Sequence, residues 1–313
     1  MLLYVGRKLV AGLVLFVTVT FVTFVLIFSN GEQSVRNNLG ELATDEQVAE
    51  RVRQLNLDKP VVAQYFSWLG DLFTGNLGRS FVSGEQVSTI LGSRVTVSIS
   101  IIALALLFMS VISIAVGVTA AIKGGWIDRV LQFLSIGAAA LPNFIVAIAL
   151  VLLLAIIVPI FPATGYIPFA DSPRGWVQSL VLPVAALVIH MVAHSAQQFR
   201  GAMVDEMKKD YVRTLRSRGL PERAVILRHA LRNASVPGLT ILSVQTIGLV
   251  GGTVLVEQIF ALPGIGQYTV VAAIAGDLPA VMGIVVFGTL LVLVVNIVAD
   301  VLNAWINPKV RLS

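Results

Sequence analysis

Six long stretches without a charged side chain dominate this sequence. The hydrocarbon core of a bilayer needs about 20 consecutive, predominantly apolar residues to be crossed by a helix, and each stretch is long enough for one. The mean hydropathy of +0.89 and the 57% share of hydrophobic residues belong to membrane proteins rather than to soluble domains. The six stretches are residues 9–31, 95–122, 130–170, 175–199, 233–256 and 278–299.

We therefore predict an all-α membrane protein with six transmembrane helices in a single domain, residues 1–313. The first stretch is interpreted as an anchor, because its apolar run is longer than that of an ordinary signal peptide and no small-residue cleavage site follows Phe28. The expected spans are about 9–29, 97–122, 132–157, 177–199, 235–256 and 280–301.

Basic residues are distributed unevenly between the two sides of these spans. With the N-terminus inside, the inner side holds fifteen Lys and Arg, whereas the two short outer loops hold only Arg174. Basic residues in short loops near the spans mark the cytoplasmic side, so the long first loop counts for little. We predict that both termini are cytoplasmic and that the net charge of +5 reflects this bias, not nucleic-acid binding. The inner residues are Arg7, Lys8, Lys123, Arg129, nine between Arg200 and Arg232, Lys309 and Arg311.

The first outer loop, residues 30–95, contains two amphipathic segments. Thr44 and Gln47 have the spacing of a capping box, and apolar residues then recur at helical spacing until Asn56. Residues 65–73 mix aromatic and polar side chains, as a helix at the level of the lipid headgroups does. We predict short amphipathic helices here, without a ligand role.

The most heavily charged stretch, "DYVRTLRSRGLPERAVILRHALRNA", runs from Asp210 to Ala234 in the third inner loop. Residues 206–218 favour a helix, and Gly219 is suited to end it in the left-handed conformation. Pro221 and Glu222 suit the first turn of a second helix. The sequence therefore predicts two helices joined at a glycine turn.

Three interpretations of this basic loop compete. Leu220, Ala224, Leu227 and Leu231 form one narrow apolar stripe on an otherwise basic helix. The loop could contact anionic lipid, bind nucleic acid as a helix-turn-helix, or dock another protein. Nucleic-acid binding is disfavoured because the first helix follows a membrane span almost directly and no third helix supports the pair. The residues alone leave lipid contact and protein docking open.

A family resemblance favours protein docking. Residues 206–245, "EMKKDYVRTLRSRGLPERAVILRHALRNASVPGLTILSVQ", resemble the cytoplasmic loop of inner-membrane permease subunits of ABC importers for dipeptides, oligopeptides and nickel. Residues 44–81, 161–168 and 256–283 are similar to the external loops and the start of the last span in that family. The resemblance implies a type I ABC importer permease fold, with a coupling helix in the cytoplasmic loop 200–234. The ATPase-docking residues that it implies are Asp210, Tyr211, Arg213, Thr214, Arg216, Arg218, Gly219, Leu220, Pro221, Glu222, Leu227 and His229.

The sequence departs from the family pattern in its first external loop. The family often has a Pro-Gly-Asp-Pro turn after the first span, where this chain has Asn30, Gly31, Glu32 and Gln33. Its usual Gly-Asp-Leu-Gly is changed by Asn76. These departures concern the external loop and leave the predicted scaffold intact.

The energy source is expected on another chain. The lysine of a P-loop follows a glycine, and none of the six lysines does so here. The resemblance implies a second homologous permease, two ATP-binding cassette ATPase subunits or domains and an external solute-binding protein as partners, besides the bilayer. ATP and Mg would be bound by the ATPases, so we expect no cofactor, metal or catalytic residue in this chain.

The resemblance also limits the substrate. It implies passage of di- or oligopeptides from the external binding protein across the cytoplasmic membrane, with nickel or a nickel chelate as the alternative. An autonomous channel or carrier is less well supported, because a carrier would show inverted repeats and ionisable residues within its spans.

Two histidines stand in the fourth span. His190 and His194 are four residues apart, the spacing of metal ligands on a helix. However, the chain has no cysteine, and His229 falls in the cytoplasmic loop. We therefore expect no bound metal and interpret the pair as packed or cavity-lining residues.

The fifth span carries a small-residue motif and an acidic residue. Gly248 and Gly252 form a G-x-x-x-G pattern, at which a second helix can approach closely. Glu257 falls at the outer end of the span, where solvation at the membrane interface is the simplest explanation. Together with His190 and His194, these residues are candidates for the translocation path or for a helix interface.

Overall fold

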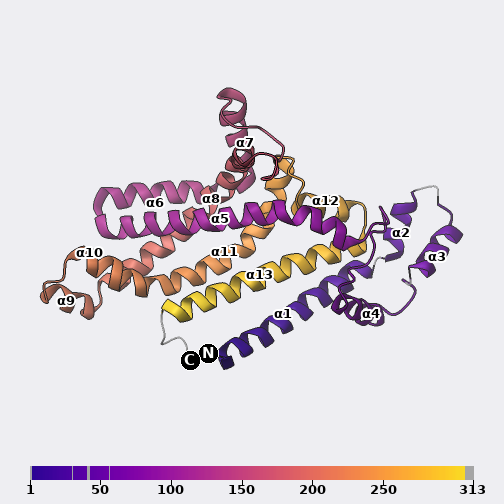
Figure 1. Cartoon of the computed structure of the whole chain (residues 1–313), viewed down its shortest axis with the longest axis horizontal. Coiled ribbons are helices and arrows are strands. Elements are labelled where there is room, and N and C mark those ends of the chain that lie inside the picture. Colours follow the sequence, from indigo (N-terminus) through magenta and orange to yellow (C-terminus); the bar gives the residue numbers. More distant parts are fainter. Residues whose placement is uncertain (1, 30, 41–42, 56, 307–313) are drawn as a thin grey trace. The chain divides into compact units, whose positions relative to one another are not determined.

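The computed structural model describes residues 2–29, 31–40, 43–55 and 57–306. Four residues that entered the predictions, Asn30, Asn56, Lys309 and Arg311, lie outside this part of the chain. The elements of the described part are helices, with one isolated antiparallel bridge in the first loop (Figure 1). The predicted all-α fold class is therefore confirmed.

Several helices are suited to crossing a membrane. Five helices in the described ranges are long and apolar enough, and a bent pair makes a sixth span if its two parts cross together. The five are α1 (Leu2–Phe28), α5 (Val87–Lys123), α8 (Pro173–Met207), α11 (Leu231–Ile259) and α13 (Leu278–Ile306).

The bent pair lies where the third span was expected. Helix α6 (Gly125–Ala140) is followed by α7 (Asn143–Val151), which continues into a π-helical turn, η1 (Leu152–Ile157), and the two parts are bent by 96°. Leu141 is extended, with φ −91° and ψ 124°, as the residue before a proline tends to be. Because Pro142 breaks the helix there, residues 132–157 do not form the straight helix that we expected.

The chain divides into two compact units. The first comprises Met1–Ser98 and Pro263–Leu293, and the second comprises Ile99–Leu262 and Val294–Ser313. Besides α1 and the adjoining parts of α5 and α13, the first unit contains α2 (Gly31–Leu39), α3 (Asp45–Gln54), α4 (Val61–Phe73) and α12 (Ile265–Ile274).

Local hydrogen bonds order the loops of the first unit. The predicted capping box is confirmed: the Gln47 N–H donates to Thr44 Oγ1 at 3.3 Å, and the Thr44 N–H donates to Gln47 Oε1 at 3.0 Å. Asp277, just before α13, accepts hydrogen bonds from the Ser80 hydroxyl and from the Phe81 N–H. The long first loop is thereby attached to the segment that begins α13.

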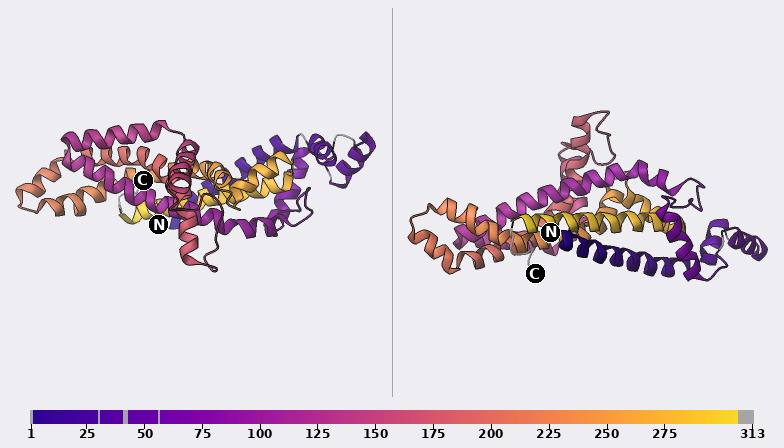
Figure 2. Two further views of the ribbon diagram at one scale, coloured as in Figure 1. Left: turned by 90° about the horizontal axis from the view of Figure 1, so that it is seen from above. Right: turned by 60° about the horizontal axis from the view of Figure 1, so that its bottom comes forward.

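Helix α8 is the centre of the second unit and packs against α6, α7 and α11. Its buried Phe199 lies between two glycines, Gly117 of α5 and Gly238 of α11. A Cβ atom at Gly117 would lie 2.7 Å from Phe199 Cβ, and one at Gly238 would lie 2.1 Å from Phe199 Cε1. The glycines therefore allow three helices to approach around one aromatic ring. The segment that joins α8 to α11 extends beyond their ends in both views of Figure 2.

Candidate functional site

The loop between α8 and α11 forms two short helical segments. Helix α9 (Asp210–Ser217) is followed by α10 (Glu222–Ala224), which passes through a π-helical turn, η2 (Val225–Ala230), into α11. The single helix expected over residues 206–218 is interrupted, because Lys209 is extended, with φ −68° and ψ 146°. Consequently the chain leaves the direction of α8 at Lys209, and α9 is a separate helix that begins at Asp210.

Gly219 ends α9 as the sequence predicted. Its φ of +77° lies in the left-handed region, which glycine adopts without steric cost. The Gly219 N–H donates to the Arg216 carbonyl at 2.9 Å, and the Leu220 N–H donates to the Leu215 carbonyl at 3.3 Å. These two bonds form a Schellman motif, and Pro221 then precedes the first residue of α10.

An ion pair spans the glycine turn. Arg216 Nε donates to Glu222 Oε2 at 3.0 Å, and Arg216 Nη2 donates to Glu222 Oε1 at 2.6 Å. The Arg216 guanidinium lowers the pKa of the Glu222 carboxyl, and the carboxylate raises the pKa of Arg216 in return. The bidentate geometry fixes the relative orientation of α9 and α10 more closely than a single contact would.

Most of the predicted docking residues are on the surface of this loop. Val212 is buried and α9 packs against η2, so the exposed residues on the other side of α9 are available to face a partner. Leu227 exposes 60% of its surface, so its side chain is accessible for a docking contact. The exposed members are Asp210, Arg213, Thr214, Arg216, Arg218, Gly219, Pro221, Glu222 and Leu227, whereas Tyr211, Leu220 and His229 are half-buried.

The buried face of the second segment differs from the predicted stripe. Instead of Leu227, the residues that enter the core are Val225, Ile226 and Ala230. The prediction assumed regular α-helical spacing, whereas residues 225–230 form a π-helical turn. The wider turn changes which side chains share a face, and this moves Leu227 to the surface.

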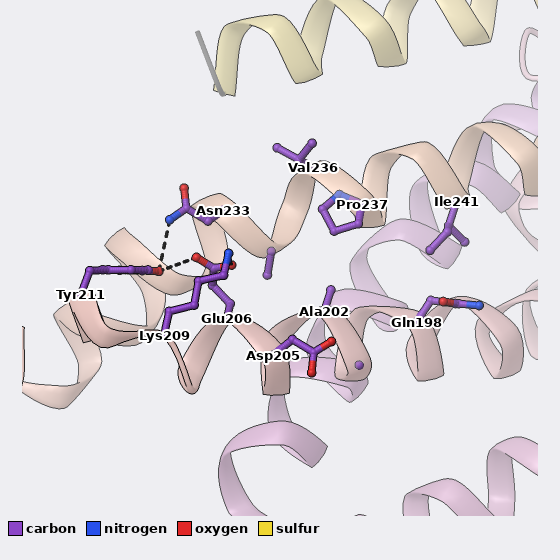
Figure 3. A pocket seen from close by; sticks show the side chains of 12 residues that line it. Gln198, Ala202, Asp205, Glu206, Lys209, Tyr211, Asn233, Val236, Pro237 and Ile241 are labelled. Atoms are coloured by element: carbon purple, nitrogen blue, oxygen red, sulfur yellow. Dashed lines mark hydrogen bonds and ion pairs between the residues drawn. The ribbon is translucent and has the colours of Figure 1, made fainter. Parts of the chain in front are cut away.

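A polar network lies at the base of the loop (Figure 3). The nearly buried Glu206 accepts hydrogen bonds from Lys209 Nζ at 2.6 Å and from the Tyr211 hydroxyl at 2.7 Å. Asn233 Nδ2 donates to the same hydroxyl at 3.1 Å. The network therefore joins the end of α8 to the starts of α9 and α11.

This network borders a cavity of about 780 Å³ between α8 and α11. Burial, and next the neighbouring Glu206 carboxylate, raise the pKa of Tyr211 to about 12. Of the network, only Tyr211 is among the docking residues that the family resemblance implies. Glu206 is an acidic residue just beyond a charge-free span. Its position was the one feature of the sequence that could have indicated the other members of the network.

The two histidines of α8 lie beside each other. Their rings are in edge contact with centroids 5.6 Å apart, and His190 Nδ1 lies 3.0 Å from the Leu141 carbonyl oxygen. In the ranges that the structure describes, no group of three or more His, Cys, Asp or Glu residues is arranged to hold a metal ion. His194 is exposed, as are Gln197 and Gln198 about one turn further along α8, so these polar side chains share one surface.

The candidates on α11 have different surroundings. A Cβ atom at Gly252 would lie 2.6 Å from Asn143 Nδ2 of α7, so this glycine is a point of close approach, whereas Gly248 is exposed. Glu257 is 0% exposed, which contradicts its interpretation as an interfacial, solvated residue. The reason is the turn after α11, where the Leu262 N–H donates to the Glu257 carbonyl and both Phe260 and Leu262 are buried.

Two family models together match nearly the whole chain. Residues 113–312 match the family described as "Binding-protein-dependent transport system inner membrane component", and residues 1–102 match the N-terminal region of membrane components of such systems. The chain belongs to this family. As a family member, it is a multi-pass permease subunit of an ABC importer in the cytoplasmic membrane, and a transport subunit rather than an enzyme. The resemblance that the sequence suggested is confirmed.

Curated relatives extend this similarity over most of the chain. A Brucella abortus protein named as a peptide transport system permease is 40% identical over 87% of each chain. A dipeptide transport system permease of Lactococcus lactis is 32% identical over 96% of each. A di/tripeptide transport system permease of Pseudomonas aeruginosa is 32% identical over 99% of each. A binding-protein-dependent system also requires an ATPase and a solute-binding protein, so the chain has partners of these two classes.

Proposed function

We propose that this permease passes di- or oligopeptides from an external solute-binding protein across the cytoplasmic membrane. The observation that carries the proposal is the similarity to permeases of peptide, dipeptide and di/tripeptide systems over 87–99% of the chain. The active assembly would contain a second homologous permease and two ATPase subunits or domains, which bind the ATP and Mg.

In this proposal the loop 200–234 is cytoplasmic and transmits movement between the ATPases and the spans. The exposed residues of α9 and α10 would contact an ATPase, while Val212 and the Arg216–Glu222 pair keep the loop in one shape. The Glu206 network supports this role, because it connects α9 directly to the ends of α8 and α11. If the loop 200–234 is cytoplasmic, both termini are cytoplasmic as well.

The polar surface of α8 is our candidate for the translocation path. His194, Gln197 and Gln198 are exposed within the charge-free stretch 175–199 of α8. Polar groups at membrane depth face a protein interior or an aqueous cavity rather than lipid, and amide and imidazole groups can form hydrogen bonds with a peptide backbone. His190 lies beside this surface, Gly248 would face the second permease, and Gly252 and Glu257 serve internal packing.

Uptake by the reconstituted complex tests the substrate. Proteoliposomes with both permeases, the ATPases and the binding protein should accumulate labelled di- or oligopeptides in the presence of ATP, and should not accumulate nickel. Omitting the binding protein is the control, because delivery depends on it. Nickel uptake that is lost in His190→Ala or His194→Ala, without peptide uptake, would show that the nickel alternative is correct.

A further inference from the structure

Helix α4 is attached to α1 by a buried tyrosine. Tyr65 is 1% exposed, and its hydroxyl lies 3.2 Å from the Val17 carbonyl oxygen and 3.1 Å from Thr20 Oγ1. Its ring is in edge contact with Phe21 and Phe24, at centroid distances of 5.0 and 5.5 Å. The residues of α1 that Tyr65 contacts therefore indicate how deep α4 lies in the membrane.

Those residues lie deep in the first span. Val17 is eleven residues from Phe28, the last residue of α1, and nine residues from Lys8. At 1.5 Å per residue these separations are about 16 Å and about 14 Å. A hydrocarbon core is about 30 Å thick, so Val17 is near its centre and the Tyr65 hydroxyl reaches this level. Phe21, against the Tyr65 ring, lies about 10 Å inside the Phe28 end.

The exposed surface of α4, away from the buried Tyr65, is divided by polarity. Val62, Phe66 and Phe73 are spaced by four and seven residues, and they expose 51%, 63% and 78% of their surfaces. On the neighbouring stripe, Ser67 and Asp71 are exposed, and they line a cavity of about 260 Å³ together with polar residues such as Gln64 and with apolar residues of α1, Phe24 and Phe28. One stripe of the helix is therefore suited to water and the other to an apolar environment.

We propose that α4 is immersed in the leaflet on the Phe28 side of α1, where Val62, Phe66 and Phe73 contact lipid acyl chains. Val22 and Leu26 of α1 are also largely exposed in the same half of the span, so the apolar surface of α4 is at the depth of a lipid-facing surface. The mixture of aromatic and polar side chains in residues 65–73 predicts a position at the headgroups, whereas the contacts of Tyr65 with α1 point to a deeper one. By the orientation proposed above, this is the outer leaflet.

Spin labels on single cysteines test the depth. The chain contains no native cysteine, so Phe66→Cys can be labelled selectively and studied in the complete transporter in phosphatidylcholine–phosphatidylglycerol nanodiscs. The measurement compares collision with oxygen, which concentrates in the hydrocarbon core, and with a water-soluble nickel chelate. Ser67→Cys, one residue away on the polar stripe, is the matched control.

The proposal predicts that the oxygen-to-nickel collision ratio is several-fold higher at Phe66→Cys than at Ser67→Cys. Val62→Cys and Phe73→Cys should resemble Phe66→Cys, and they replace it if that variant fails to assemble. Equally low ratios at all four positions would overturn the proposal, because α4 would then lie in water. Nickel access at Phe66→Cys that disappears only when the binding protein is added would overturn it too, because the surface would then dock protein rather than lipid.

Discussion

Arg216 and Glu222 are joined by two hydrogen bonds across the turn at Gly219. The pair joins the last turn of α9 to the first residue of α10. It therefore holds the two segments together at the corner that Gly219 forms between them. The Schellman bonds of Gly219 and Leu220 fix the same corner from the backbone. In the proposed role of this loop, a partner that displaces α9 would displace α10 and η2 as well, because α9 is joined to α10 by this pair and packs against η2.

Gly219→Val should uncouple transport from ATP hydrolysis. A φ of +77° costs a residue with a side chain about 1–2 kcal/mol, and more for a β-branched one, so the corner should open. The measurement is uptake together with ATP hydrolysis in the reconstituted complex, where uptake should fall more than hydrolysis. Gly84→Val is the matched control, because Gly84 has a similar φ of +72° in the loop predicted to be external. Normal uptake in Gly219→Val would contradict the role of this corner.

Tyr211, the one tyrosine of the loop 200–234, should ionise well above the usual tyrosine pKa. Because burial and Glu206 raise the pKa of Tyr211 to about 12, the neutral phenol contributes stability that is complete below pH 10, the usual tyrosine pKa, and is lost as the pH rises through about 12. In an ultraviolet titration, the difference between wild type and Tyr211→Phe should appear near pH 12. A difference curve centred near pH 10 would show that the hydroxyl does not contact Glu206.

Gly238→Ala should destabilise the second unit. The added methyl group would lie 2.1 Å from the ring of Phe199, and Phe199 is buried with its Cβ atom close to Gly117, so we expect a loss of about 1–3 kcal/mol. Gly251→Ala is the control on the same helix, because its methyl group would meet no atom within 4 Å. Thermal unfolding in detergent should separate the two variants. Equal midpoints would mean that Phe199 does not occupy this position.

Cysteine labelling should establish the orientation. Asn37→Cys, in α2, should react with an impermeant maleimide from outside the cell, whereas Lys209→Cys should react only after the membrane is opened. The reason is the excess of basic residues on the predicted inner side. Reaction at Lys209→Cys from outside, with Asn37→Cys protected, would reverse every assignment of sides.

Features that depend on neighbours in the sequence were predicted well. The charge-free stretches correspond to the apolar helices, because a bilayer requires such lengths. The Thr44 capping box and the left-handed Gly219 are both confirmed, since each is determined by a few adjacent residues.

Features that depend on distant contacts or on irregular helices were missed. The burial of Glu257 follows from the turn that ends at Leu262, and the network of Glu206 requires α11 to lie beside α8. The regular stripe expected over Leu220, Ala224, Leu227 and Leu231 is interrupted by a π-helical turn, which periodicity arguments based on 3.6 residues per turn cannot show. The bend at Pro142 could have been anticipated, because prolines disfavour a helical residue before them.

The most direct test of this account is a cross-link from α9 to the ATPase. Arg213 is 77% exposed at its side chain, so Arg213→Cys can carry a photoactivatable maleimide without disturbing the buried Val212. In the complete transporter, we predict that this position cross-links to the ATPase and that Asn37→Cys, treated in the same way, does not. If Arg213→Cys gives no ATPase cross-link in a complex that hydrolyses ATP and imports peptide, the loop is not the docking element.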